Sequence, residues 1–242
     1  MGRLPKTDDF PASVKLNIVP PPNNNPPTNT LLLLHGLGDT NTPFTTLASQ
    51  LNLPETACIS LQGPNPLLDL GGFHWGDDII FDSTNGGLDS DAGFAKTTEV
   101  LKNVVQEGLV GKCGFKEREI LLLGFGQGGM AALNYAVTHH PTKELGGIIS
   151  IASGLPSSAP ASLDPKLPTP VLICAGSSES AVTSTSEDKL KRVFEHVEVK
   201  RYRRPGDSMP SNRDEMLPVM QFLSRRLRSV KGVPEGAVEV GA

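Results

Sequence analysis

The chain has 242 residues, a hydrophobic fraction of 38% and a formal net charge of -4 at pH 7. That much apolar material can bury one sizeable core, and the even spread of both signs of charge excludes a basic surface for nucleic acid. No apolar run approaches the roughly 18 residues that a membrane-spanning helix needs.

The N-terminal segment MGRLPKTDDF lacks the apolar region of a secretory signal. Cys58, Cys113 and Cys174 are odd in number and do not have the spacing of metal ligands. Cys58 and Cys174 lie in apolar stretches, which is typical of buried thiols. We expect a cytoplasmic protein without a metal site.

Apolar runs alternate with helical patterns, which favours a largely parallel sheet with crossover helices. Strands are expected at 14–19, 30–36, 57–63, 119–125, 146–154, 170–176 and 197–203, and helices at 44–51, 93–109, 128–140, 187–196 and 213–229. The pattern predicts one α/β domain over residues 1–242, with a flexible tail from about residue 230. Residues 64–88 are too irregular for an element, and a loop of that length in a compact domain is usually functional.

The segment Gly124-Phe125-Gly126-Gln127-Gly128-Gly129 lies between a buried strand and a helix. In an α/β-hydrolase this place holds the nucleophile elbow, G-x-S-x-G. The outer glycines are needed because the turn is sharp, and the central residue is forced to a positive φ. Here the centre is Gly126, which has no hydroxyl group to attack a carbonyl.

Four segments together resemble the acyl-protein thioesterase/carboxylesterase family of α/β-hydrolases: HGLGDT (35–40), FHWGDD (73–78), GFGQGGMAAL (124–133) and GGIISIASGLP (146–156). The similarity extends from about residue 31 to residue 227. It implies the α/β-hydrolase fold, with a mostly parallel central sheet and helices on both faces. It also implies an oxyanion hole made of the backbone amides of Leu37 and Gln127.

The same resemblance locates the rest of the triad. The family's acid falls on Glu179, in Gly176-Ser177-Ser178-Glu179, and the turn that carries its histidine reads Pro205-Gly206-Asp207-Ser208-Met209-Pro210. The histidine is absent, and Asp207 lies near its position. Loss of both serine and histidine points to a natural lineage released from serine chemistry, in which hydrolysis by the family mechanism is effectively absent.

His35, Trp75 and Phe125 are candidates for contact with a substrate. His35 in such a loop more often supports the loop than acts as a base, and Trp75 is as well explained by packing as by a wall for an acyl chain. His74 is the histidine best placed to visit the site, because its loop covers the pocket in the family. His139, His140 and His196 close helices, where cations are favoured in any case.

Three functions remain open. The favoured one is a non-catalytic homologue that binds an acyl or ester-type small molecule, a lipidated protein or another protein partner. A second is an enzyme that uses Glu179 and Asp207 as an acid/base pair under the oxyanion amides, against the plainer interpretation that Asp207 caps a turn and Glu179 is solvated. A third is a residual ester or thioester hydrolase, in which Ser177, Ser178 or Ser208 would be proposed as nucleophile.

Nucleotide and metal cofactors are not implied. Gly124, Gly126 and Gly129 satisfy the string G-x-G-x-x-G, but that fingerprint normally opens the first βαβ unit and here comes late in the sheet. Members of the family often pair near the mouth of the active site, so the resemblance allows a homodimer.

Overall fold

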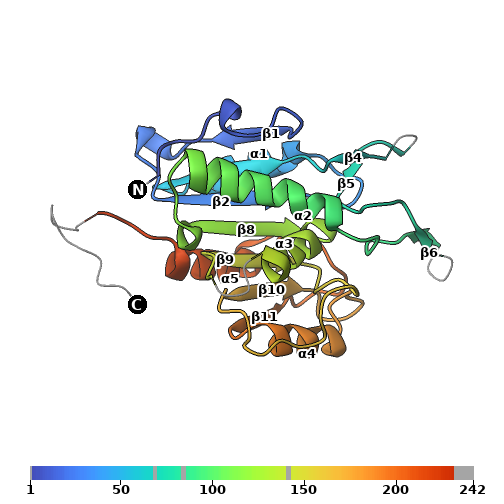
Figure 1. Ribbon diagram of the computed structural model, residues 1–242. Helices are drawn as coiled ribbons and strands as arrows, with labels where there is room; N and C mark the ends of the chain where they lie inside the picture. Colours follow the sequence, from blue (N-terminus) through green and yellow to red (C-terminus); the bar gives the residue numbers. More distant parts are fainter. Residues whose placement is uncertain (1, 68–69, 83–85, 140–142, 232–242) are drawn as a thin grey trace.

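The computed structural model describes residues 2–67, 70–82, 86–139 and 143–231. Its centre is a seven-stranded sheet in the order β1-β3-β2-β8-β9-β10-β11, in which only β1 runs antiparallel to its neighbour (Figure 1). The strands are β1 (Leu16–Val19), β2 (Asn29–Leu34), β3 (Thr56–Leu61), β8 (Ile120–Phe125), β9 (Gly147–Ile151), β10 (Val171–Ala175) and β11 (Val197–Arg201). The predicted parallel sheet is confirmed.

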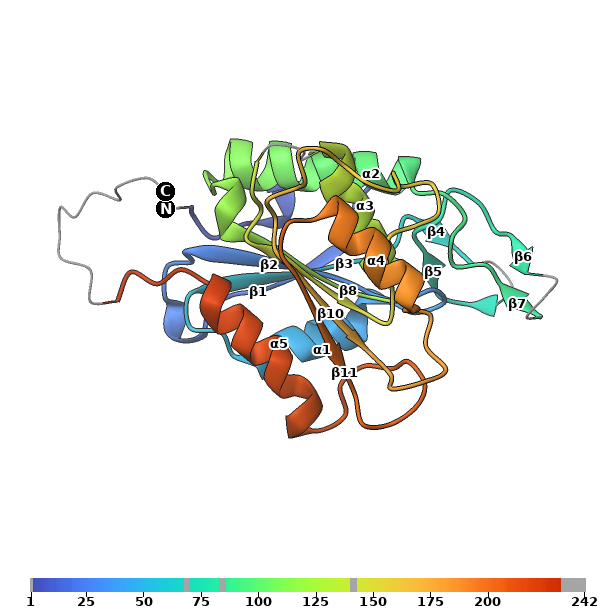
Figure 2. The same ribbon diagram turned by 90° about the horizontal axis from the view of Figure 1, so that it is seen from below.

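Helices cover both faces of this sheet. Figure 2 shows α2, α3 and α4 on one face and α1 and α5 on the other. Their bounds are α1 (Asn41–Leu51), α2 (Ala95–Lys102), α3 (Gln127–His139), α4 (Ser184–Val193) and α5 (Arg213–Arg226), with short 3-10 turns η1 (Thr7–Asp9), η2 (Pro22–Asn24) and η5 (Glu117–Glu119). A π-helical segment, η4 (Asn103–Lys112), continues α2 without a break, so the single helix predicted over 93–109 has two windings.

The central strands read as unbroken apolar runs because each of them feeds two cores. In β2, Leu32 and Leu34 pack under α2, α3 and α4, while Leu31 and Leu33 face α1 and α5. Successive side chains of a strand point to opposite faces, so a strand covered by helices on both sides needs apolar residues at every position. Burying one leucine contributes about 1.5–3 kcal/mol.

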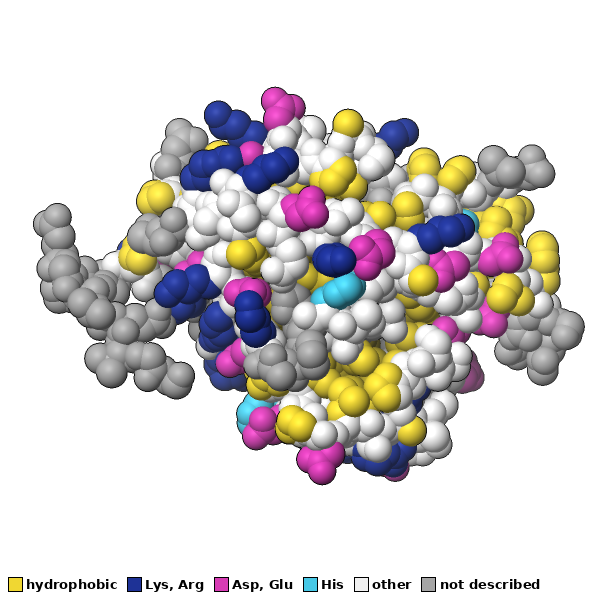
Figure 3. All heavy atoms as spheres, viewed as in Figure 1, with side chains coloured by type: hydrophobic (Ala, Val, Ile, Leu, Met, Phe, Trp, Pro, Cys, Tyr) yellow, Lys and Arg dark blue, Asp and Glu magenta, His cyan; other side chains and the backbone are white. Residues whose placement is uncertain are grey.

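Two small hairpins occupy the stretch that the sequence pattern assigns to an irregular loop. They are β4 (Asn65–Pro66) with β5 (Phe73–His74), and β6 (Phe81–Asp82) with β7 (Gly87–Leu88). Both extend beyond the end of the sheet, and Figure 3 shows apolar side chains gathered at that end. The exposed large ones here are Leu70, Ile79, Ile80 and Phe81.

Two further expectations concern the chain as a whole. No helix in the part of the chain that the structure describes is long and apolar enough to cross a membrane. The predicted flexible tail lies outside the described residues from residue 232 onward, as does His140.

The connections leave β2 and β8 in opposite directions across the sheet. From β2 the chain continues to β3 on one side, whereas from β8 it continues through β9, β10 and β11 on the other. In open α/β sheets, ligands bind at such a switch point, outside the carboxyl ends of the strands. The loops that follow β2 and β8 therefore mark the place to look for a site.

Candidate functional site at the carboxyl ends of β2 and β8

The turn from β8 into α3 has the geometry of an elbow. Gly126 adopts φ +50°, its N–H donates to the Ile151 carbonyl at 2.8 Å, and its own carbonyl accepts from Gly129 and Met130. This positive φ is one that residues with a Cβ rarely adopt. The backbone therefore keeps the strained conformation that would display a side chain at position 126.

The three alternate glycines of the elbow meet different surroundings. A Cβ at Gly124 would lie 2.4 Å from the Gly128 carbonyl carbon, and one at Gly128 would lie 2.4 Å from the His35 carbonyl oxygen. A Cβ at Gly126 would meet nothing within 4 Å. The outer glycines are required by packing, whereas the space in front of Gly126 is open.

Two backbone amides belong to the turns that follow β2 and β8. β2 and β8 pair in parallel with Leu34 opposite Gly124, and Leu37 and Gln127 each follow three residues later. Neither the Leu37 amide nor the Gln127 amide has a hydrogen-bond partner among the described residues. The Gln127 amide also belongs to the first turn of α3, where N–H groups carry partial positive charge. The carboxyl ends of β2 and β8 are thus each followed by one backbone N–H without a partner in the described part of the chain.

His35 supports the loop that carries Leu37. Its Nε2 accepts from the Gly63 N–H at 2.8 Å, which leaves Nδ1 as the protonated nitrogen, donating to the Gly36 carbonyl at 2.7 Å. Burial lowers the pKa of His35, which favours the neutral ring that these two hydrogen bonds require. The ring is fully buried with both nitrogens engaged, and it offers no surface to a ligand or a proton.

Trp75 is a second support of the same loop. Its indole N–H donates to the His35 carbonyl at 2.8 Å, its ring lies 5.1 Å from the His35 ring, and its backbone N–H donates to the Gln127 side chain at 2.7 Å. The side chain is fully buried. The structure places Trp75 in the core, so packing explains it and a wall for an acyl chain does not.

The Gln127 side chain has a role that the motif alone does not reveal. Its Oε1 holds the Trp75 amide, and its Nε2 donates to the Ser90 carbonyl at 3.1 Å. The side chain thus binds the segment that contains the two hairpins, residues 65–91 (the hairpin segment), to the start of α3. The backbone amide of Gln127 takes no part in these contacts. Phe125, beside it, is half-buried and packs against Gly36, where a Cβ would lie 2.8 Å from its ring.

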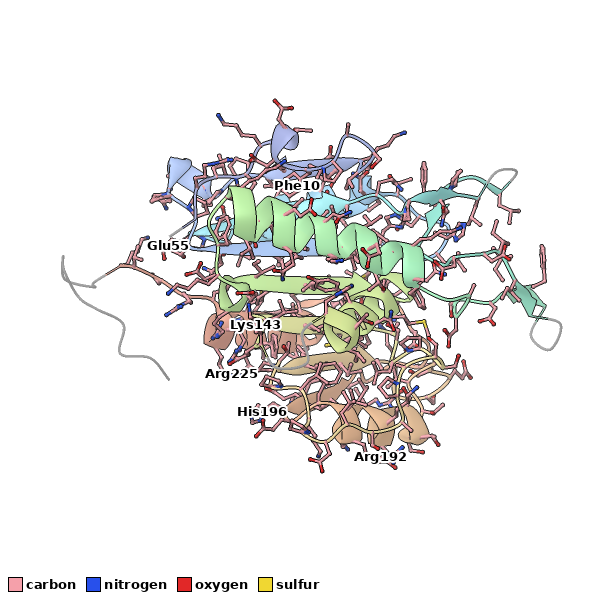
Figure 4. All side chains as sticks on the ribbon, viewed as in Figure 1. Phe10, Glu55, Lys143, Arg192, His196 and Arg225 are labelled. Atoms are coloured by element: carbon pink, nitrogen blue, oxygen red, sulfur yellow. The ribbon has the colours of Figure 1, made fainter. Side chains whose placement is uncertain are left out.

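The other described histidines belong to other elements. His139 ends α3 beside Glu99, and His196 precedes β11, at the amino end of that strand (Figure 4). His74 is buried in β5, and its Nδ1 has no hydrogen-bond partner among the described residues. In the part of the chain that the structure describes, no histidine lines the cleft at Gly126.

Asp207 organises two loops. Its carboxylate accepts from the Gly176 N–H at 3.0 Å and from the Ala181 N–H at 2.7 Å. Glu179, between those two residues, is exposed and has φ +52°, and no described group bonds its side chain. The arrangement is that of a turn-capping aspartate and a solvated glutamate, so the contacts do not support an acid/base pair.

A cleft of about 330 Å³ opens at Gly126. Its walls come from the loop after β9, which includes Ser153 and Leu155, and from the start of α4, which includes Thr185 and Ser186. Ser153 and Leu155 belong to the segment 146–156 that carries the family resemblance, whereas no sequence pattern singles out Thr185 and Ser186 at the start of α4. Only the topology brings them beside the elbow. Among the described residues there is no group of three or more His, Cys, Asp or Glu side chains that could hold a metal ion.

Comparison with known proteins agrees with this fold. A family model described as Phospholipase/Carboxylesterase matches residues 17–227. An uncharacterized hydrolase of Schizosaccharomyces pombe is 34% identical over 204 residues, which are 81% of this chain and 83% of the relative. An uncharacterized hydrolase of Mycosarcoma maydis is 37% identical over 127 residues, and the chain spans about half of its length, 47%.

Solved structures show the same fold. The esterase PE8 aligns with a TM-score of 0.69 and 21% identity over 88% of this chain and 99% of its own. Acyl-protein thioesterase 2 of Zea mays aligns with a TM-score of 0.60 and 24% identity over 88% and 99%. These likenesses establish the α/β-hydrolase fold, and they leave the chemistry to the residues of the site.

Proposed function

Because this chain belongs to the phospholipase/carboxylesterase family, we propose that it is a member which has lost serine-hydrolase chemistry and binds an ester or acyl-type ligand at the elbow. One observation carries this proposal. The backbone of the elbow is intact and Gly126, at φ +50°, faces open space, yet this position has no hydroxyl group. The unpaired amides of Leu37 and Gln127 support the proposal as candidate ligands of a carbonyl oxygen.

The remaining components of a serine mechanism are missing in the same place. A serine nucleophile needs a base within hydrogen-bond reach. The lining of the cleft includes no described histidine, and the two carboxylate oxygens of Asp207 are engaged by backbone amides. The cleft lining thus contributes no group that would activate a nucleophile for acyl transfer.

Binding without turnover follows from this arrangement. An ester carbonyl placed over Gly126 would accept hydrogen bonds from the Leu37 and Gln127 amides, as an oxyanion does in an active hydrolase. Each such bond contributes about 0.5–1.5 kcal/mol. The ligand would then dissociate unchanged, which suits a carrier, a sensor or a scaffold.

The first experiment measures turnover of p-nitrophenyl butyrate and of an acyl thioester beside an active serine esterase. Loss of a whole triad costs on the order of 10⁶ in kcat, and we expect a deficit of that size. A rate within about 10²-fold of the active esterase would overturn the proposal. In that event Ser177, Ser178 and Ser208 would be tested by alanine substitution.

The second experiment measures binding of the same unhydrolysed ester by saturation-transfer NMR. Gly126→Asn is the blocking variant, because asparagine tolerates a positive φ and its side chain would fill the open space in front of Gly126. Gly114→Asn is the matched control, since Gly114 has φ +79°, also faces open space and lies before η5, away from the elbow. Binding that survives Gly126→Asn would show that the elbow is not the site.

A further inference from the structure

The strand β11 forms one edge of the seven-stranded sheet. It comes last in the strand order and, among the described residues, pairs only with β10, in parallel. In the view from that edge, α4 lies on one side of β11 and α5 on the other (Figure 2). An edge strand presents a row of N–H and C=O groups without partners, which is a template for pairing with another strand.

The hydrogen bonds beside β11 show which of its backbone groups face outward. Tyr202, directly after the strand, donates its N–H to the Ala175 carbonyl of β10 at 2.8 Å. Because the direction of the backbone groups alternates along a strand, the even-numbered residues of β11 face β10 and the odd-numbered ones face away. The residues whose N–H and C=O groups face away, with no hydrogen-bond partner in the described part of the chain, are Val197, Val199 and Arg201.

The side chains of β11 carry opposite charges two positions apart. Glu198 bonds Arg225 of α5, and because side chains of a strand repeat with a period of two, Lys200 lies on the same face. Both side chains are exposed, and Lys200 has no ion pair among the described residues. Exposed Glu195 before the strand and exposed Arg203 after it extend the same order, with acidic residues first and basic residues second.

An antiparallel pairing of β11 with a second copy of itself satisfies both features in one register. With Val199 opposite its own counterpart on a two-fold axis, Val197 lies opposite Arg201 of the partner subunit, so the outward groups meet as hydrogen-bonded pairs. In the same register Glu198 lies opposite Lys200 of the partner subunit, and symmetry repeats the contact. An in-register parallel pairing would instead place like charges side by side.

Charged residues on an edge strand often have the opposite effect and prevent pairing, as does proline. The other edge of the sheet has such protection, because β1 is followed directly by Pro20, Pro21 and Pro22. In β11 there is no proline, and the glutamate and the lysine attract rather than repel a second copy in the antiparallel register. The charge pattern of β11 therefore favours self-pairing.

We propose that the outer edge of β11 is the interface of a homodimer, in which the two seven-stranded sheets join into one continuous sheet. The occupant is a second copy of this chain because the charge order of β11 is complementary to itself. This interface differs from a pairing near the mouth of the active site. It lies three strands from β8 in the strand order, so it is separate from the elbow and independent of the proposed function.

Sedimentation velocity of the full chain measures self-association, with samples up to about 0.5 mM because small interfaces are commonly weak. Lys200→Glu is the first variant, since it breaks no ion pair of the single chain and places glutamates opposite one another across the two-fold axis. We expect it to weaken dimerisation at least about tenfold. Lys112→Glu, an exposed lysine at the end of η4, is the matched control and should leave dimerisation unchanged.

A reciprocal variant makes the test independent of any loss of stability. Glu198→Lys places lysines opposite one another, so neither it nor Lys200→Glu should dimerise well alone. An equimolar mixture of the two variants should dimerise, because each glutamate then lies opposite a lysine again. Damage to the fold of one variant cannot produce this restoration. A mixture that associates no better than its components would overturn the proposed interface.

Amide hydrogen exchange followed by NMR tests the register. The Val199 N–H should be protected only at concentrations where the wild-type chain is dimeric, whereas the Lys200 N–H, which faces β10, should be protected at every concentration. A dimer that leaves the Val199 amide unprotected would overturn the strand pairing. A chain that remains monomeric throughout the concentration series, or a dimer that Lys200→Glu leaves intact, would overturn the homodimer interface as a whole.

Discussion

The elbow shows how two glycines can be fixed by packing while a third is not. Gly124 and Gly128 stand where the backbone of β8, α3 and the end of β2 come within contact distance of one another. Gly126 stands where the backbone turns outward, with strain in φ and free volume in front. The same residue type therefore has two unrelated physical roles within five positions.

Alanine substitutions separate these roles. Gly128→Ala places a Cβ 2.4 Å from the His35 carbonyl oxygen, so we expect destabilisation of about 3 kcal/mol or more from overpacking between backbone segments. Gly126→Ala adds only the cost of a positive φ, about 1–2 kcal/mol. Urea unfolding followed by the fluorescence of Trp75, the single tryptophan, measures both. Equal losses would contradict the packing argument.

Asp207 and Glu179 offer a second comparison at this scale. Asp207→Ala removes the acceptor of two backbone N–H groups, and we expect a loss of about 1–3 kcal/mol in the free energy of unfolding. Glu179→Gln changes an exposed side chain and should stay within about 0.5 kcal/mol. Urea unfolding measures this difference. If the two carboxylates instead acted as a catalytic pair, each substitution would abolish turnover in an ester assay, whatever its effect on the free energy of unfolding.

At the scale of elements, α2 is held at its start by a residue from a distant segment. The Asp77 carboxylate accepts from the Ala95 N–H at 2.7 Å and from the Lys96 N–H at 2.8 Å. The Asp77 amide in turn donates to the Ala92 and Gly93 carbonyls. One aspartate thus caps the helix and closes the base of the hairpin segment that borders the cleft.

Removing this cap should loosen α2 and the hairpin segment together. Asp77→Ala is expected to cost about 1 kcal/mol, with a smaller loss for Asp77→Asn, which keeps one acceptor oxygen. The measurement is urea unfolding together with amide hydrogen exchange of the first turn of α2. Asp78→Ala, at the exposed next position, is the control and should leave exchange in that turn unchanged. Faster exchange in both variants would argue against Asp77 as the specific cap.

Some elements of this molecule can be predicted from its sequence and others cannot. Strands such as β2 and β8 are predictable because burial on both faces demands an apolar residue at every position. The elbow and the loop after β2 are predictable because close backbone contacts or a positive φ require glycine at particular positions in them. The hairpins β4–β5 and β6–β7 are not, since strands of two residues carry no periodicity.

The walls of the site were not predictable for a related reason. The buried backbone N–H of Trp75 bonds the side chain of Gln127, which is distant in the sequence. The cleft at Gly126 is formed by loops and helix starts that are adjacent only after the sheet forms. Sequence patterns report the periodicity of each segment and the sterics of each turn. They do not report which loops meet at the carboxyl ends of the strands, and that meeting determines which side chains line this cleft.

At the scale of the whole molecule, buried ionisable groups link folding to pH. Burial lowers the pKa of His35, His74 and His139, so the folded protein favours their neutral forms. For two carboxyl groups the folded protein instead favours the charged form. The hydrogen bonds from Arg3 and Arg204 hold the pKa values of Asp9 and Glu215 below their usual range. The two classes should act in separate ranges of pH.

Stability is therefore expected to fall in two steps as the pH decreases. Below about pH 6.5 the histidines are protonated in the unfolded chain but not yet in the folded protein, because burial lowers their pKa. The free energy of unfolding therefore falls by up to about 1.4 kcal/mol per pH unit for each histidine. Below about pH 4.5 the stabilising contribution of ionised Asp9 and Glu215 is lost as well, because protonation removes their charge-assisted bonds. Urea unfolding between pH 8 and pH 2 measures both steps.

His74→Gln should flatten the first step by up to one proton, because it removes one titrating group, and should leave the second step intact. The ring nitrogen Nδ1 of His74 has no described partner, so the substitution breaks no hydrogen bond of that atom. Stability that stays constant between pH 7.5 and pH 5.5 would mean that these histidines become protonated within the folded protein.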